Sequence, residues 1–296
     1  MDWDKLRVFH AVADAGSFTR AGDLLNLSQS AVSRQIGALE EDLRVPLFHR
    51  HARGLILTEQ GETLYRTAHE IYSKVQMAEA MLAENKVHPS GPLAITATIG
   101  FSIVWLTPRM VEFQKLYPEI EMTLIAEDRE LDLSMREADL AIRMRAPTQP
   151  DLVQRRLMTV HNHAYASPAY LEEYGTPIDV ADLDDHRLII YSGGPLSRVT
   201  TPNWLLRAGE NTASPRRPVL KVNNILAMLG AVESGLGIAG LPDYIVRDHS
   251  SAVPVMPNLE GPSIETYFVY PEELRHSKRI AVFRDFLLEK VKQTGF

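Results

Sequence analysis

Hydrophobic positions at three- and four-residue steps predict two short helices within residues 17–43. The first would follow Ser17 and the second Ser28, because a serine hydroxyl can accept a hydrogen bond from an orphan amide of the first helical turn. Asn26 lies between them and tolerates left-handed backbone. Apolar residues over 6–13 predict a third helix that completes a small core. The stripe of the second helix consists of Val32, Ile36, Leu39 and Leu43.

The second predicted helix also has a polar side near its start. Its members are Gln29, Ser30, Ser33 and Arg34. A recognition helix needs this arrangement, because one face is fixed in a core while N-terminal side chains reach base edges and phosphates in the major groove. The pattern therefore predicts a helix-turn-helix that binds DNA. The alternative is an ordinary helical hairpin whose serines are solvated.

An acidic run, Glu40-Glu41-Asp42, ends the same helix. At a rise of 1.5 Å per residue it lies roughly 10 Å along the axis from Arg34. Carboxylates are mildly unfavourable at a helix C-terminus. We interpret the run as a solvated helix end that points away from phosphate.

Two short apolar runs flank a basic tip over residues 46–57. They predict a two-stranded wing in which Arg50 and Arg53 touch the DNA backbone or enter a minor groove. His49 and His51 have the spacing of metal ligands, but the chain has no cysteine and nothing nearby completes such a site. We expect no metal there.

A long helix is predicted after Thr58, which would cap it. Its apolar seam suits a coiled coil between two chains. The alternative is a helix packed on its own domain. Residues 85–92 contain Pro, Ser and Gly and predict a hinge, so we favour a homodimer through residues 59–85. The seam consists of Gly61, Leu64, Tyr65, Ala68, Ile71, Tyr72, Val75, Ala78 and Leu82.

Residues 93–296 alternate between strand-like and helical stretches, which predicts α/β layers with mainly parallel strands. Strands are expected at 93–98, 121–126, 139–143, 164–166, 188–191, 219–222, 236–241 and 266–270. Helices are expected at 103–117, 131–137, 224–234 and 279–292.

Open α/β sheets bind ligands beyond the carboxyl ends of their strands. The hydroxyls, helix-start amides and single arginine found there suit a small carboxylate or a similar anion. Ordinary loop residues are the alternative, and Arg143 could equally pair with Asp139 or Asp128. The candidate effector-binding residues are Thr98, Gly100, Phe101, Ser102, Arg143, Tyr191, Asn223 and Gly240.

Three apparent enzyme or metal motifs carry little weight. Residues 235–240 match G-x-G-x-x-G, but a dinucleotide site needs a strand before the motif, and here a helix precedes it. These glycines are better explained by a helix stop and close packing. Residues 100–102 begin like a nucleophile elbow, yet Val104 replaces the second glycine. His161 and His163 could bind metal, although a crossover strand explains them equally well. We expect no enzyme activity.

Composition adds broad limits. A chain of 296 residues suits two or three domains, and 45% hydrophobic with 23% charged residues is typical of a globular protein. No run of about 18 apolar residues predicts a membrane span, and residues 1–4 do not begin a signal peptide. The absence of cysteine excludes disulfides and thiolate chemistry. We expect a cytoplasmic bacterial protein without a cofactor.

Net charge changes the picture of DNA binding. The chain carries −7, and residues 1–88 hold 10 Lys and Arg against 12 Asp and Glu. The predicted DNA-binding half is therefore not basic. Non-specific affinity for phosphate should be modest, and binding should depend on a local patch and on dimerisation.

Residues 6–61 resemble the winged helix-turn-helix of LysR-type transcriptional regulators. The motif S-Q-S-A-V-S-R-Q-I-x-x-L-E occupies 28–40, and P-L-F-x-R and L-T-E-Q-G follow it. The resemblance continues more loosely after residue 92, and within the family the chain is similar to an alpha-proteobacterial group of global regulators. By this resemblance, Gln29, Ser30, Ser33 and Arg34 would read DNA, with Arg50 and Arg53 as wing contacts.

The resemblance also implies a domain organisation. Residues 1–58 would form an all-α winged helix-turn-helix, residues 59–88 a coiled-coil linker helix, and residues 93–296 a two-lobed α/β effector domain of periplasmic-binding-protein type. Lobe I would comprise about 93–162 with 267–296, and lobe II about 163–266.

The implied partners are a pseudo-palindromic operator in double-stranded DNA, a small-molecule effector, RNA polymerase and further copies of the chain in a tetramer, with the protein associated with the nucleoid. Two alternatives remain: a solute-binding or enzymatic α/β protein with a helical appendage, and a regulator of this family that binds no ligand.

Overall fold

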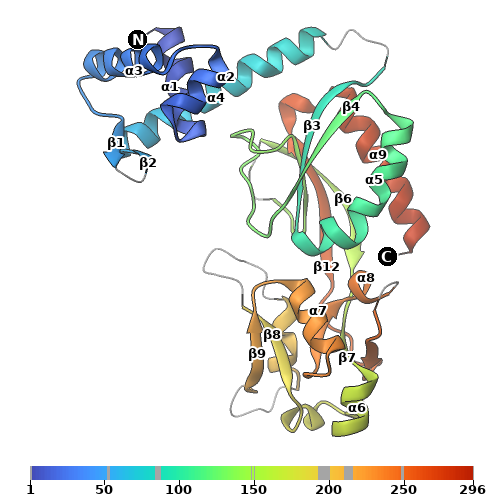
Figure 1. Cartoon of the computed structure of the whole chain (residues 1–296). Coiled ribbons are helices and arrows are strands. Elements are labelled where there is room, and N and C mark those ends of the chain that lie inside the picture. Colours follow the sequence, from blue (N-terminus) through green and yellow to red (C-terminus); the bar gives the residue numbers. More distant parts are fainter. Residues whose placement is uncertain are drawn as a thin grey trace. The chain divides into compact units, whose positions relative to one another are not determined.

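The computed structural model describes residues 2–51, 54–83, 88–147, 149, 151–192, 201–209, 216–247 and 250–295. It divides into two compact units (Figure 1). The first comprises Met1–Asn85 and Ser134–Arg136, and the second comprises Lys86–Leu133 and Glu137–Phe296.

The first unit is a small helical core followed by a hairpin and a long helix. Its elements are α1 (Trp3–Ala15), α2 (Phe18–Leu25), α3 (Gln29–Leu43), β1 (Phe48–His51), β2 (Gly54–Leu57) and α4 (Glu59–Ala83). The core forms where α1, α2 and α3 meet, and β1 pairs antiparallel with β2. This arrangement confirms the three predicted helices and the two-stranded wing.

The helix ends follow the predicted caps with one exception. The Ser28 hydroxyl accepts a hydrogen bond of 3.2 Å from the amide of Ala31, and Asn26 ends α2 with φ 54° in the left-handed region. The Thr58 hydroxyl accepts from the amide of Gly61 at 3.0 Å, at the start of α4. Ser17 stands at the N-cap of α2 but makes no side-chain capping bond, so that part of the prediction is wrong.

The apolar seam of α4 has two roles along its length. Leu64, Tyr65 and Ala68 pack against the core of the first unit, with Ala68 only 2% exposed. Ile71 and Val75, further along, are 36% and 41% exposed. The beginning of the helix therefore packs on its own domain, whereas these two apolar side chains are left on the surface.

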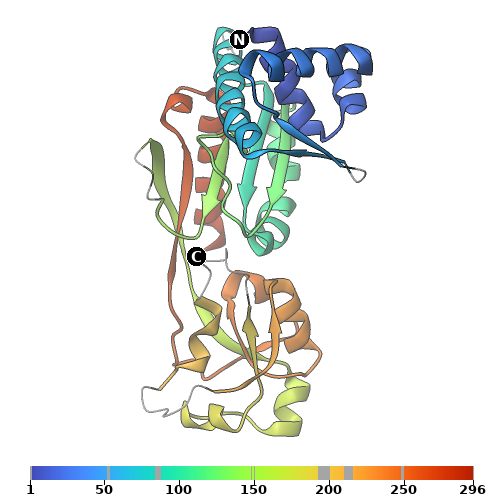
Figure 2. The ribbon, with the colours of Figure 1, turned by 90° about the vertical axis from the view of Figure 1, so that its left-hand side faces the viewer.

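Lobe I of the second unit is built on a sheet with strand order β4-β3-β5-β12-β6. Its strands are β3 (Gly91–Ala97), β4 (Ile120–Ala126), β5 (Leu140–Arg143), β6 (Leu152–Val160) and β12 (Ile264–Pro271). β3 runs parallel to β4 and β5, and β12 is antiparallel to β5 and β6. α5 (Thr107–Leu116) and α9 (Lys278–Thr294) lie on one face of this sheet (Figures 1 and 2).

Lobe II is inserted between β6 and β12. Its sheets have the orders β10-β7-β11 and β8-β9. The strands are β7 (Asn162–Ala166), β8 (Leu188–Tyr191), β9 (Pro218–Val222), β10 (Ala239–Pro242) and β11 (Val253–Val255). The helices are α6 (Pro168–Tyr174), α7 (Ile225–Glu233) and α8 (Asp243–Val246). β7 is antiparallel to both of its neighbours, so the mainly parallel arrangement that the alternation predicts does not extend to this sheet.

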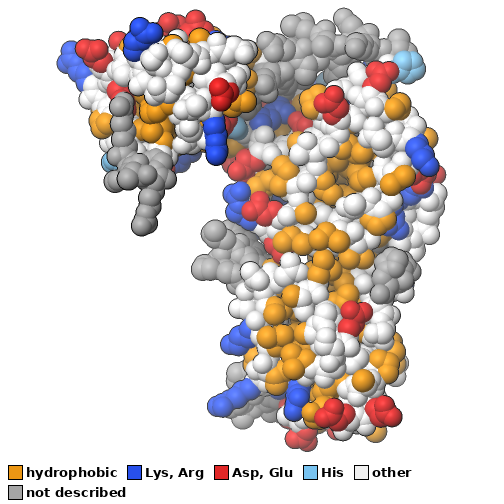
Figure 3. All heavy atoms as spheres, in the orientation of Figure 1, with side chains coloured by type: hydrophobic (Ala, Val, Ile, Leu, Met, Phe, Trp, Pro, Cys, Tyr) orange, Lys and Arg blue, Asp and Glu red, His pale blue; other side chains and the backbone are white. Residues whose placement is uncertain are grey.

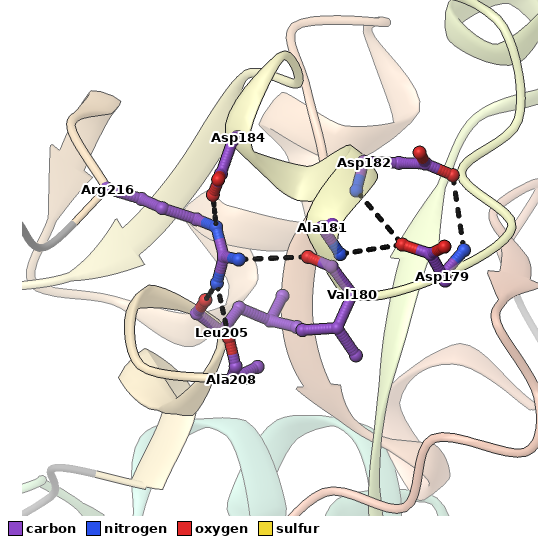
Figure 4. A network of polar contacts seen from close by, with 8 residues as sticks. All are labelled: Asp179, Val180, Ala181, Asp182, Asp184, Leu205, Ala208 and Arg216. Atoms are coloured by element: carbon purple, nitrogen blue, oxygen red, sulfur yellow. Dashed lines mark hydrogen bonds and ion pairs between the residues drawn. The ribbon is translucent and has the colours of Figure 1, made fainter. Parts of the chain in front are cut away.

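The buried side chain of Arg216 joins two irregular segments of lobe II (Figure 4). Arg216 is only 5% exposed at its side chain and forms an ion pair of 2.6 Å with Asp184. Its guanidinium also donates to the carbonyl oxygens of Val180, Leu205 and Ala208 at 2.7–2.9 Å. One side chain thereby joins the turn Ala181–Asp184 to the turn Thr201–Leu206 and to Ala208 just after it.

Three predictions on the second unit need correction. β6 was not expected as a strand. No helix forms over 131–137, where Arg136 has φ 60° and the amide of Glu137 bonds to the carbonyl of Asp132. The helix expected from residue 103 begins instead as a π-helix, Phe101–Leu106. None of the described helices has the length and apolar character that a membrane span requires.

Candidate functional site

The predicted recognition helix has one buried face and one exposed face. Val32, Ile36 and Leu39 are completely buried, and Gln29 and Arg34 are exposed.

The exposed residues contact one another and their own helix. Ser30 is exposed, Ser33 is half-buried, and the hydroxyls of Ser28 and Ser30 are 3.1 Å apart. Nε of Arg34 donates to the carbonyl oxygen of Ser30 at 3.3 Å. The four predicted reading residues thus lie over the first two turns of α3, with Ser33 the least accessible.

The turn before α3 depends on a glycine. A Cβ atom at Gly22 would lie 2.6 Å from the carbonyl oxygen of Leu27. The Leu27 amide itself bonds to the carbonyl of Gly22 at 2.9 Å. This close backbone contact fixes how α2 meets the recognition helix.

Two of the three acidic residues at the end of α3 bind other parts of the first unit, which corrects the interpretation of this run as solvated. Oε1 of Glu40 accepts hydrogen bonds from the amides of Leu47 and Phe48 at 2.7 and 3.3 Å. Glu40 therefore fixes the start of the wing. Asp42 pairs with Lys5 of α1 at 2.7 Å, and the hydrogen bond from Lys5 lowers the pKa of the Asp42 carboxyl.

The wing arginines are described only in part. Arg50 belongs to β1 and lies opposite Leu55 of β2. The side chain of Arg50 and all of Arg53 lie outside the described residues. On the face drawn in Figure 3, the described Lys and Arg side chains of the first unit are interspersed with acidic ones, in agreement with the low net charge of this part.

A cavity of about 760 Å³ lies between lobes I and II. Of the eight predicted effector-binding residues, the four that line it are Thr98, Gly100, Arg143 and Tyr191. It also contains residues that were not singled out as ligand contacts, chiefly Asp128, Glu130, Arg145, Asn162 and Tyr244.

The other four predicted residues lie elsewhere. The π-helix turns Phe101 and Ser102 into the core of lobe I, where both are fully buried. Phe101 stacks on Trp105, and the Ser102 hydroxyl donates to the carbonyl of Ala97 at 3.3 Å. Asn223 is exposed just before α7, and Gly240 pairs with Ala164 inside the sheet of lobe II.

Arg143 is the buried cation of the cavity. It is 6% exposed and donates to Oε1 of Gln149 at 3.1 Å and to the carbonyl of Leu131 at 2.9 Å. Desolvation lowers the pKa of its guanidinium, and the nearby carboxylate of Glu130 opposes that shift. Within the described residues, no carboxylate forms an ion pair with it.

The two carboxylates considered as partners of Arg143 have other roles. Asp139 accepts from the amide of Ala94 at 2.8 Å. Asp128 accepts from the amide of Ile99 at 3.0 Å. Since a carboxylate already binds that amide, the helix start is a poorer anion site than predicted.

Two further residues of the cavity have polar atoms in unusual surroundings. Asn162 is 1% exposed, and its Oδ1 has no hydrogen-bond partner among the described residues. Burial, and after it the charge of Asp128, raises the pKa of the Tyr244 hydroxyl. The spacing of residues in the sequence does not predict either position, because both side chains become part of the cavity only when the two lobes pack together.

The glycine motif at 235–240 has the structural role that was inferred from its context. α7 ends directly before it, and Gly235 has φ 79°. A Cβ at Gly237 would lie 2.3 Å from the carbonyl oxygen of Arg187. A helix stop and close packing therefore explain these glycines.

Comparisons with known proteins agree over nearly the whole chain. Residues 3–62 match the bacterial regulatory helix-turn-helix protein of the lysR family, and residues 86–292 match the LysR substrate binding domain. An HTH-type transcriptional regulator of Xanthomonas campestris is 30% identical, covering 98% of this chain and 86% of that protein. The regulator CrgA of Neisseria meningitidis serogroup C is 31% identical, covering 97% of this chain and 96% of that protein.

Solved structures give the same result. The structure of CrgA from Neisseria meningitidis has a TM-score of 0.61 at 28% identity, covering 98% of this chain and 99% of that chain. The Vibrio cholerae virulence activator AphB has a TM-score of 0.62 at 25% identity, with the same coverage. These matches set aside the solute-binding and enzymatic alternatives. The chain belongs to the LysR family: it is a DNA-binding transcriptional regulator with a two-lobed effector-binding domain, and it is not an enzyme.

Proposed function

We propose that this regulator reads a pseudo-palindromic operator as a dimer, with the start of α3 in the major groove of each half-site. The observation that carries the proposal is the division of α3 into a fully buried apolar face and an exposed polar one. Amide, hydroxyl and guanidinium groups can then reach base edges. The proposed reading residues are Gln29, Ser30, Ser33 and Arg34, with Arg50 and Arg53 as wing contacts.

The dimer would form through residues 59–85. Ile71 and Val75 support this, since they are exposed apolar side chains one helical turn apart on α4. A second copy of the helix would cover them. Two dimers would associate into a tetramer at the operator, in the cytoplasm at the nucleoid, within reach of RNA polymerase.

The effector would be a small anion in the cavity between the lobes. Arg143 supports this choice, because its buried guanidinium forms no ion pair with the residues that the structure describes and is therefore a strong site for a carboxylate or phosphate. Thr98 offers a hydroxyl group in the same cavity. The ligand would act by binding one arrangement of the lobes better than another.

DNA binding is tested with the full-length protein and fragments from upstream of its neighbouring genes. Arg34→Ala should weaken binding about 10- to 100-fold. Arg207→Ala, which removes an exposed charge from lobe II, is the matched control and should leave binding unchanged. Equal affinity of Arg34→Ala and the parent protein, with unchanged oligomeric state, would contradict the proposed reading face.

Effector binding is tested separately by thermal shift against small anions. A ligand at a hundred times its Kd should stabilise the protein by about 2.7 kcal/mol. Arg143→Gln should abolish this shift. Stabilisation of the parent and of Arg143→Gln to the same extent would overturn the role of Arg143, and DNA binding that no metabolite alters would favour a ligand-independent regulator.

A further inference from the structure

Two histidines that belong to neither site described above meet between the first helix and the linker helix. Nε2 of His10 in α1 lies 2.8 Å from Nδ1 of His69 in α4. The His10 side chain is only 8% exposed. The ring of His10 also packs against Tyr65 and Tyr72, with centroids 5.6 and 4.9 Å away. The two imidazoles thus meet edge to edge, with their ring centroids 5.0 Å apart.

A carboxylate completes the group. Asp14 lies one helical turn after His10, and its Oδ2 is 3.5 Å from Nδ1 of His10. Its Oδ1 accepts a hydrogen bond from the Tyr65 hydroxyl. One possible ligand atom from each of His10, Asp14 and His69 lies within 4.8 Å of the other two.

Hydrogen bonding leaves this group incomplete. A neutral imidazole has one donor and one acceptor nitrogen, and one hydrogen between the facing nitrogens satisfies only that contact. Nε2 of His69 is buried and has no hydrogen-bond partner in the described part of the chain. The polar capacity of the pair is therefore not fully used by the described residues, although this orphan nitrogen lies on the edge of His69 that faces away from His10.

We propose that His10, Asp14 and His69 bind a divalent transition-metal ion of the Zn²⁺ class. Imidazole and carboxylate ligands suit such ions, and two ligands four residues apart on one helix can chelate from the same face. The Asp14 side chain is 43% exposed, so an ion can reach the site from solvent at this carboxylate.

Metal binding requires a rearrangement of the three side chains. Tetrahedral Zn²⁺ with bonds of about 2.0–2.1 Å separates its ligand atoms by roughly 3.3 Å. The facing imidazole nitrogens, now 2.8 Å apart, have to separate slightly. The Asp14 carboxylate, which now lies at Nδ1 of His10, has to move to the side of Nε2, where His69 lies. Three protein ligands leave the fourth position to water.

The bound ion would join α1 to the helix that leaves the DNA-reading core. Because an ion that binds only the folded arrangement stabilises it, metal would make the first unit more resistant to unfolding. The supply of metal would then alter the stability of the first unit through residues that are neither proposed DNA contacts nor part of the effector cavity.

The experiment titrates the full-length protein with Zn²⁺ alone, using calorimetry and melting temperature, and repeats it with Co²⁺ for its visible absorption. We expect one equivalent per chain, a raised melting temperature and a Co²⁺ spectrum typical of nitrogen and oxygen ligands. Mg²⁺, which prefers octahedral oxygen ligands, should produce neither effect. A parent protein that binds no Zn²⁺ would overturn the proposal.

Variants locate the ion. His69→Gln and Asp14→Asn should weaken Zn²⁺ binding at least 10-fold. His161→Gln, which removes the exposed histidine of the pair His161 and His163, should keep it. Asp14→Asn alters a partly exposed side chain and keeps its shape, so it remains informative if His69→Gln fails to fold. Unchanged affinity in Asp14→Asn, or loss of binding in His161→Gln, would overturn the assignment.

Discussion

The hydroxyl of Tyr191 donates a hydrogen bond of 3.1 Å to Oδ2 of Asp128. Tyr191 ends β8 of lobe II, and Asp128 follows β4 of lobe I. Because both side chains line the cavity, this bond joins the two lobes directly beside the proposed effector. The other oxygen of Asp128 is held by the amide of Ile99, so the acceptor is fixed in place.

Removal of this bond should loosen the lobes. Tyr191→Phe is expected to lower the free energy of unfolding by about 0.5–1.5 kcal/mol, the value of one intramolecular hydrogen bond, and to widen the distribution of interlobe distances in solution scattering. Tyr117→Phe is the control, because that ring packs on Phe113. Equal loss in both variants would contradict a specific role of the Tyr191 hydroxyl.

The turn of the helix-turn-helix should tolerate no side chain at Gly22. Gly22→Ala places a Cβ against the carbonyl oxygen of Leu27 and should cost about 1–3 kcal/mol by overpacking. Gly37→Ala, inside α3 with no atom within 4 Å of the new Cβ apart from the surrounding backbone of the helix itself, should instead gain up to about 1 kcal/mol in helix propensity. Urea unfolding measures both, and a shift of the same sign in the two variants would be inconsistent with this geometry.

Glu40 and Glu41 are neighbours in sequence with different expected effects. Glu40→Ala leaves the amides of Leu47 and Phe48 without their acceptor and should cost about 1.5–3 kcal/mol, as expected for a charged hydrogen bond. Glu41→Ala changes an exposed side chain and should stay within about 0.5 kcal/mol. Thermal unfolding distinguishes them, and a neutral Glu40→Ala would show that the wing start is held by other contacts.

Arg216 should not be replaceable by lysine. Lysine lacks the planar fork that serves Asp184 and three carbonyl oxygens at once. Arg216→Lys should therefore destabilise the second unit by at least about 2 kcal/mol, while Arg217→Lys, at an exposed position, should be neutral. Urea unfolding measures this loss, and limited proteolysis of lobe II measures it independently. An Arg216→Lys variant as resistant to proteolysis as the parent protein would contradict the prediction.

Local periodicity predicted the DNA-reading part well because its signals are short-range. The stripe Val32–Ile36–Leu39 and the left-handed Asn26 depend on neighbours within a few residues. The role of Glu40 could not be predicted in this way, since its partners are backbone amides seven and eight residues away. Composition gave no indication of which carboxylate of the acidic run would turn inward.

The cavity was predictable only in outline. The rule on the carboxyl ends of strands predicts Thr98 and Arg143 as cavity residues. It fails for Phe101 and Ser102, because they begin a π-helix whose geometry turns their side chains into the core. β6 escaped detection because its middle residues 154–156 are polar and exposed, as expected at the edge of a sheet.

The insertion of lobe II between β6 and β12 has a practical consequence for protein engineering. Val160 and Ile264 are antiparallel partners, and just beyond them Nδ1 of His161 lies 3.2 Å from Oγ of Ser263. The chain therefore leaves lobe I and returns to it through two neighbouring strands, so lobe II is encoded by one uninterrupted stretch of gene. An exchange of lobe II for another domain whose termini lie close together thus needs only two junctions, both at this strand pair.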